Sequence, residues 1–187
     1  MDVDDFWSLI ESARSDDRPF AEALTERLAA TSTEQILAFQ ERVDALDGAV
    51  CRWDVRAAAY LIGSGCSDDS FMDFRAGLIA LGRVWYERAV RAPDDLADHP
   101  DVRTGVGKYG EGVVFSEEAG TAACEAFERR TGGDADDFYE AWDQYRASRG
   151  IQESPADMGE DFDFSDPLQM RRRLPRLAAL YLAEPTV

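Results

Sequence analysis

Residues 32–60 read STEQILAFQERVDALDGAVCRWDVRAAAY, and this stretch indicates the fold class most clearly. Ser32 with Gln35 three residues later forms a capping-box signature, which marks the start of a helix. Apolar residues then recur in alternating steps of three and four through about seven turns, the spacing of a helix packed against a neighbour. They are Ile36, Phe39, Val43, Leu46, Val50, Trp53, Ala57 and Tyr60. The stretch therefore predicts helical structure.

Gly48 interrupts this apolar series. A glycine in a helix costs about 1 kcal/mol relative to alanine, so we expect a kink or break near residues 47–52. A coiled-coil dimer would show the same spacing. We favour a long central helix buried in its own domain, because the flanking positions lack a sustained charge pattern.

Helical patterns extend outward from this stretch in both directions. Gly63-Ser64-Gly65 predicts the end of the central element, and Ser67 followed by two acids predicts the next start. A later helix is expected to stop before Pro93. Further helices are expected over residues 2–14, from Pro19, over 116–130 and over 134–149. The fold class is all-α.

Two segments lack a helical pattern. Residues 93–115 contain two prolines and four glycines, which predicts an irregular middle loop. Residues 152–166 contain six acids and no base, which indicates a mobile or loosely docked linker. Residues 168–182 predict a terminal helix, started or kinked by Pro175. We therefore expect one compact multi-helix domain over 1–150, an acidic linker over 151–167, and a C-terminal helix over 168–187 that packs back on the domain.

The charge is the most unusual global property. The 187 residues contain 38 acids and 20 bases, a formal charge of -18. Such a field opposes binding to nucleic acid and to anionic membranes, because both carry negative charge. Two interpretations stay open: the charge confers solubility, or it forms an acidic surface that meets a basic protein. Three widely spaced cysteines indicate buried free thiols. With no signal-peptide pattern or apolar run, a cytoplasmic protein is expected.

The sequence contains partial motifs for cofactors and metals, but the residues around them do not fit such sites. Residues 105–110 match Gly-x-Gly-x-x-Gly, but a polar turn precedes them where a dinucleotide site needs a buried strand. His99 is the only histidine, which makes a zinc cluster hard to assemble, and its Asp-His-Pro context suggests a solvated loop residue. Asp68, Asp69 and Asp73 would suit a hard cation, but capping of a helix start explains them more simply. No cofactor, metal site or catalytic residue is predicted.

Several runs resemble one protein family. They are Asp4-Asp5-Phe6-Trp7-Ser8-Leu9-Ile10, Cys51-Arg52-Trp53-Asp54, Ala58-Ala59-Tyr60-Leu61-Ile62-Gly63 and Gly65-Cys66-Ser67-Asp68-Asp69, continued by Phe71, Phe74-Arg75, Leu78-Ile79 and Gly82-Arg83. The chain resembles the bacterial domain-of-unknown-function family number 4240, best over residues 2–100. The family pattern has aromatic residues where this chain has Arg56 and Gly77, so a pocket that depends on those rings would be altered. The resemblance implies no catalytic residues.

The same runs contain the candidate binding residues, Trp53, Asp54, Cys66, Asp68, Asp69 and Arg75. Two antiparallel helices joined by the Gly65–Asp69 turn would bring Asp54 near Arg75, and a carboxylate–guanidinium pair would fix that junction. A polar pocket would lie there. The competing interpretation is structural packing, because aromatic and small residues at helical spacing usually form a core.

The sequence indicates the function less directly than the fold. The leading hypothesis is a non-enzymatic interaction module, regulatory or of an immunity-protein kind, that uses acidic surface to bind a basic protein. The alternative is a carboxylate-dependent hydrolase or transferase, with Mg²⁺ as an optional ion, near Asp54, Asp68, Asp69 and Arg75. A third possibility is mimicry of nucleic acid by aligned carboxylates, which requires the acids to lie on one face.

Overall fold

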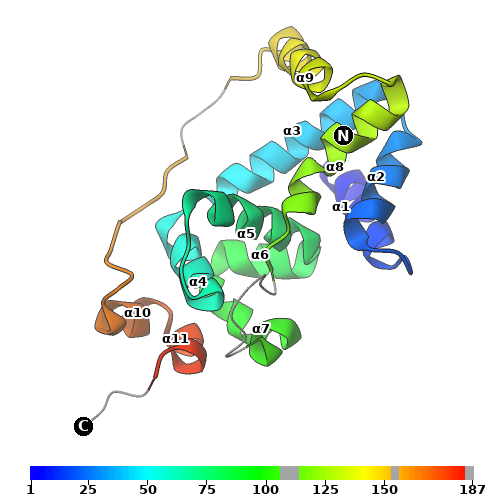
Figure 1. Ribbon diagram of the computed structural model, residues 1–187. Coiled ribbons are helices and arrows are strands. Elements are labelled where there is room, and N and C mark those ends of the chain that lie inside the picture. Colours follow the sequence, from blue (N-terminus) through cyan, green and yellow to red (C-terminus); the bar gives the residue numbers. More distant parts are fainter. Residues whose placement is uncertain (106–113, 153–155, 184–187) are drawn as a thin grey trace. The chain divides into compact units, whose positions relative to one another are not determined.

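The computed structural model describes residues 1–105, 114–152 and 156–183. Within these ranges all regular structure is helical and no residue lies in a strand, which confirms the all-α fold class (Figure 1). None of the helices in these ranges is long and apolar enough to cross a membrane. The chain forms two compact units, Met1–Leu46 with Glu117–Pro155, and Asp47–Ser116 with Ala156–Val187.

The first unit contains the N-terminal helices and two later ones. Helix α2 packs against α1 and α8, and α8 packs against α9. Phe6 of α1 stacks on Phe39 of α3 with ring centroids 4.8 Å apart, and both side chains are buried. These helices bury the apolar faces that the sequence pattern predicts. The helices are α1 (Val3–Arg14), α2 (Phe20–Ala29), α3 (Thr33–Ala49, whose end belongs to the other unit), α8 (Glu117–Thr131) and α9 (Ala135–Arg149).

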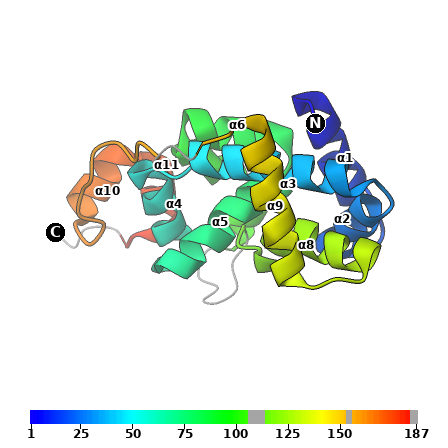
Figure 2. The ribbon, with the colours of Figure 1, turned by 90° about the horizontal axis from the view of Figure 1, so that it is seen from above.

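The second unit is built around α4. This helix contacts α5, α11 and a 3-10 helix, η1, and α10 packs on α11; Figure 2 shows α11 beside α4. Val55, Ala58 and Leu61 are among its buried residues. A dense apolar core in this unit therefore surrounds one short helix. The elements are α4 (Trp53–Gly63), α5 (Asp68–Ala80), α6 (Arg83–Arg91), η1 (Pro93–Asp98), α7 (Pro100–Thr104), α10 (Pro167–Arg173) and α11 (Pro175–Tyr181).

The predicted breaks in the helical pattern are confirmed. Ser32 and Gln35 exchange capping hydrogen bonds at the start of α3, with donor–acceptor distances of 3.3 and 3.2 Å. Helix α3 ends at Ala49, one residue after Gly48, and α4 begins at Trp53. Ser64 ends α4 in the left-handed region at φ 56°, and Gly65 follows at φ 137°, a conformation that favours glycine.

The expected irregular loop over residues 93–115 is wrong for its first half. Residues 93–98 form η1, and 100–104 form α7. The Asp94 carboxylate accepts hydrogen bonds from the backbone N–H groups of Arg176 and Leu177, so it caps α11. The Arg176 guanidinium pairs with Asp95 and Asp98, which lowers the pKa of Asp98. Contacts with Arg176, about eighty positions further along the chain, thus order this segment.

The C-terminal part forms two helices where one was expected. Pro175 begins α11, as predicted for a proline that starts or kinks a helix, and Leu174 separates it from α10. Leu177 and Ala178 are fully buried, and the Tyr181 hydroxyl donates to the Val102 carbonyl at 2.6 Å. Val114 and Phe115 lie in no strand, and residues 106–110 of the Gly-x-Gly-x-x-Gly match lie outside the described residues.

Candidate functional site

The α4 N-terminus carries a closed carboxylate–guanidinium fork. Arg52 donates from Nε to Oδ1 of Asp54 at 3.0 Å and from Nη2 to Oδ2 at 3.1 Å. Its third nitrogen, Nη1, donates to the Val90 carbonyl at 2.9 Å, which ties α4 to α6. A bidentate pair of this kind fixes both side chains in one geometry. Asp54 therefore serves local structure at the start of α4.

Arginines and aromatic rings alternate along the half-buried junction of α4 and α5. The guanidinium of Arg56 lies 5.7 Å from the Trp53 ring centroid and 5.6 Å from that of Phe71. On the same ring of Phe71, the guanidinium of Arg75 lies at 4.9 Å. Cations over ring faces are attracted by the negative π-face, each contact contributing about 0.5–2 kcal/mol. We call Trp53, Arg56, Phe71 and Arg75 the stacked cluster.

The predicted pair between Asp54 and Arg75 is wrong. Arg75 Nη1 donates instead to Oδ2 of Asp47 at 2.5 Å, and Asp54 binds Arg52. Asp47 lies in the last turn of α3, within the same unit as α5. Arg75 fixes a junction as expected, but the junction joins α5 to the end of α3.

The remaining candidate residues lie on the turn before α5. Asp68 accepts from Arg56 Nη2 at 2.5 Å, although its own side chain is 89 % exposed. Asp69 is exposed in the first turn of α5. Cys66 is half-buried, and burial raises the pKa of its thiol, which receives a contact from the Ser70 hydroxyl. The structure thus brings Trp53, Cys66 and Asp68 to Arg56, whereas Arg75 shares only the Phe71 ring with it. Asp54 and Asp69 lie at other positions. All three cysteines are half-buried, where buried thiols were expected.

Arg56 and Gly77, the two positions expected to depart from the family pattern, lie in different environments. Arg56 is the centre of the stacked cluster, where its planar guanidinium lies over the rings of Trp53 and Phe71. Gly77 is buried, and a side chain there would collide with the backbone carbonyl of Val114. The aromatic residues spaced around Trp53 were the sequence feature that could have indicated the position of Arg56 among rings. No sequence signal indicated the Gly77 contact.

His99 is buried, where a solvated loop histidine was expected. Its side chain caps α7: Nδ1 accepts a hydrogen bond from the Asp101 backbone N–H at 3.2 Å. The ring packs edge-on against Trp85 with centroids 4.7 Å apart. The residue holds a helix start in place.

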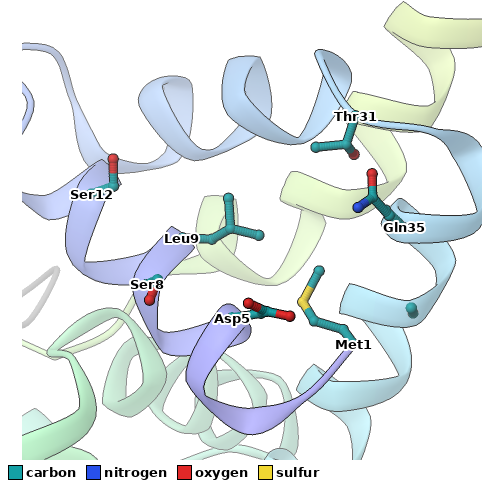
Figure 3. A pocket seen from close by; sticks show the side chains of 8 residues that line it. Met1, Asp5, Ser8, Leu9, Ser12, Thr31 and Gln35 are labelled. Atoms are coloured by element: carbon teal, nitrogen blue, oxygen red, sulfur yellow. The ribbon is translucent and has the colours of Figure 1, made fainter.

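The first unit has a groove between α1 and the start of α3, drawn in Figure 3. Its volume is about 490 Å³. The Asp5 carboxylate, the Met1 side chain and the Gln35 carboxamide face it, and the Leu9 side chain lies to one side of them. Serine hydroxyls and the Thr31 side chain complete a mixed lining. Most of the lining residues are exposed or half-exposed, so the groove is shallow.

Helix α9 has one anchored face and one acidic face. Phe138 packs on Phe127 of α8 with centroids 5.6 Å apart, and Trp142 Nε1 donates to Glu41 of α3 at 3.2 Å. The opposite face carries residues at steps of three and four, all exposed. We call this the α9 acidic face: Asp136, Tyr139, Glu140 and Asp143.

The acidic linker is docked over part of its length. The Met158 carbonyl accepts from the Trp53 backbone N–H at 2.9 Å, and the Phe164 ring lies 6.1 Å from that of Trp53. Among the described residues, no group of three or more His, Cys, Asp or Glu side chains lies close enough to hold a metal ion.

Comparison with known proteins places the chain in a family without a known activity. No curated protein matches the chain, and no solved structure matches it. One family model matches residues 1–129, which include α1 through most of α8. That span contains the stacked cluster, the Arg52–Asp54 fork and the groove. Since the match covers well over half of the 187 residues, the chain belongs to the family described as Protein of unknown function (DUF4240).

Proposed function

We propose that this protein is a non-enzymatic, regulatory or immunity-type interaction module, and that the α9 acidic face binds a basic patch on a partner protein. One observation supports this proposal above the others. Helix α9 is held from one side by Phe138 and Trp142, while its opposite side presents Asp136, Glu140 and Asp143 around Tyr139, which is 54 % exposed. A rigid helix with an exposed ring among acids suits a cationic partner.

The arginines of the chain add to this argument. Many of them are engaged within the molecule, for example Arg146 with Glu41 at 3.4 Å and Arg149 with Glu34 at 2.7 Å. Arg146 and Arg149 of α9 therefore neutralise acids of α3, whereas the acids of the α9 acidic face project into solvent. Complementary charge of this kind raises association rates and selects partners.

The experiment compares two charge-matched variants of the full chain. The test variant carries Asp136→Asn, Glu140→Gln and Asp143→Asn. The control carries Asp17→Asn, Glu117→Gln and Glu118→Gln, three exposed acids elsewhere in the same unit. A partner captured with the wild type is purified and its Kd is measured at about 50 and about 200 mM salt.

We expect the affinity of the wild type for the partner to fall as the salt concentration rises. In the test variant the affinity should fall about tenfold or more, since surface charge pairs act together over a Debye length. The control should stay close to the wild type. A partner whose affinity ignores both salt and the test variant would contradict the proposal. Equal losses in both variants would indicate a general charge effect and would also contradict it, as would capture of no partner at all.

The alternative, a carboxylate-dependent hydrolase or transferase, has weaker support. Asp54 and Asp68 would be its acids, but arginines hold both of them. A thermal-shift series with Mg²⁺ and Mn²⁺ addresses it. Saturable stabilisation that disappears with Asp68→Asn or Asp69→Asn would favour the enzyme.

A further inference from the structure

Residues 158–164, with the sequence MGEDFDF, lie against α4 and α10 without forming a helix. We call them the docked segment. The Phe164 ring lies 6.1 Å from Trp53 and 5.7 Å from Tyr60, both on α4. Phe162 lies under the Arg173 guanidinium at 4.2 Å, and Glu160 pairs with the same arginine at 2.8 Å. The segment is thus held by ring contacts and an ion pair, as an extended peptide ligand would be.

The surface beneath the segment has a defined chemistry. Trp53 is the first residue of α4, so its backbone N–H has no acceptor within the helix, and the Met158 carbonyl supplies one at 2.9 Å. Trp53 and Tyr60 stand about two turns apart on α4 and offer two ring faces. Arg173 adds a cation that binds a ring and a carboxylate together. The surface therefore suits an extended peptide with alternating acidic and aromatic residues.

The docked segment is held more weakly than the core around it. Phe162 and Phe164 are only half-buried, and the glycine and three acids of the stretch 159–163 are exposed. Buried core rings such as Phe74 are 0 % exposed by comparison. A tethered segment acts at an effective concentration of about millimolar, so it occupies its site even when each contact is weak. An external peptide must displace it.

The family match gives an independent argument. Trp53 and Tyr60 lie within the matched residues 1–129, whereas the docked segment and Arg173 lie beyond them. The receiving face of α4 thus belongs to the family region, and the segment that covers it belongs to the part of this chain that follows the match.

We propose that the surface formed by Trp53, Tyr60 and Arg173 binds an acidic–aromatic peptide of a partner protein, and that the docked segment is an internal competitor for that site. The partner peptide has a carboxylate two residues before one aromatic ring and a second ring two residues after it, as Glu160, Phe162 and Phe164 do. This site is separate from the α9 acidic face and selects the opposite chemistry.

The test frees the surface and offers the peptide in trans. The full chain with Phe162→Ala and Phe164→Ala is titrated into a fluorescein-labelled peptide DMGEDFDFSD, which copies residues 157–166, and anisotropy is measured. We expect saturable binding to this double variant and binding at least about tenfold weaker to the wild type, because the tethered segment competes. A peptide with both phenylalanines changed to alanine should not bind.

Matched variants locate the site. Arg173→Gln added to the double variant should weaken peptide binding about tenfold, while Arg172→Gln, at an exposed neighbouring position, should leave it unchanged. A second way to loosen the segment is Glu160→Lys. The side chain of residue 160 is 79 % exposed, so a lysine fits there, and its positive charge repels Arg173 while both phenylalanine rings remain. This variant should bind the labelled peptide more tightly than the wild type does.

Two results would overturn the proposal. One is failure of the peptide to bind both the double variant and Glu160→Lys while circular dichroism shows that they are folded. The other is a concentration-dependent dimer of the wild type that the double variant loses, because this would assign the surface to a second copy of the chain.

Discussion

The α4–α5 hairpin and α9 are both helical and amphipathic, yet they hold their positions in different ways. Helix α4 buries six of its eleven residues, whereas α9 buries only Phe138 among fifteen. The hairpin is therefore fixed by an apolar core with arginine–ring contacts on its rim. Helix α9 is held by a few ring contacts and ion pairs, so most of its surface stays available. Stability accordingly depends more on the hairpin than on α9, most of whose surface is exposed.

The greatest loss of stability is expected in the core of the hairpin. Phe74 of α5 is 0 % exposed and lies 5.2 Å from the Phe115 ring, so Phe74→Ala should destabilise the protein by about 3–5 kcal/mol. Tyr139→Ala on α9 removes a similar ring that is 54 % exposed and should cost no more than about 0.5 kcal/mol. Urea unfolding measures both. Similar losses for the two variants would contradict the comparison.

A pair of helical glycines provides the next test. An alanine at Gly77 would press against the Val114 carbonyl, so Gly77→Ala should cost about 1–3 kcal/mol. A methyl group at Gly48 of α3 would meet no described atom of another element within 4 Å, so Gly48→Ala should be neutral or stabilise by up to about 1 kcal/mol. Thermal unfolding distinguishes the two. A Gly77→Ala variant as stable as the wild type would show that the Val114 carbonyl does not press on α5.

The cap of α9 should have a moderate effect. Asp134 accepts from the Asp137 backbone N–H at 3.1 Å, and the Asp137 side chain accepts in return from the Asp134 N–H. Loss of such a cap costs about 1 kcal/mol, so Asp134→Ala should lower stability by that amount. Asp136→Ala, in the same first turn but outside the capping box, serves as the control and should change stability by less than half as much.

A still smaller effect concerns the docked segment, which follows α9 in the chain and lies on α4. The Arg173 guanidinium lowers the pKa of Glu160 from its ordinary value of 4.5. The contribution of this pair is thus present above the ordinary pKa and is lost as the pH falls through the folded pKa. Wild type should melt slightly higher than Glu160→Gln at neutral pH, and the two should converge in acid. A difference that does not shrink as the pH falls below 4.5 would contradict this assignment.

Local signals in the sequence located most helix ends. Ser32 with Gln35, Gly48, Gly63-Ser64-Gly65, Ser67 and Pro175 mark boundaries that the structure confirms. These signals work because capping and chain reversal involve backbone groups within four residues of one another. The prediction for His99 was wrong because its burial depends on Trp85, fourteen positions away, which no local rule weighs.

The candidate site was only half predictable for a similar reason. Trp53 and Asp68 do contact Arg56, and Arg75 lies on the same Phe71 ring as Arg56, since one short turn joins their helices. The predicted partner of Arg75 was wrong because a helix surface offers several carboxylates within reach of a long guanidinium. Arg75 pairs with Asp47 because the path of the chain between Asp47 and Trp53 brings that carboxylate within its reach. The predicted break at Gly48 does not by itself specify this path.

Composition and neighbouring residues were enough to establish that the chain is helical, where most helices begin and end, which faces are apolar, and that the net charge is strongly negative. Other features emerged only in the folded chain: which carboxylate each arginine meets, that residues 93–104 are helical, and that an acidic segment lies on Trp53. Such contacts join positions far apart in the sequence, and their free energy exists only once packing has brought the side chains together.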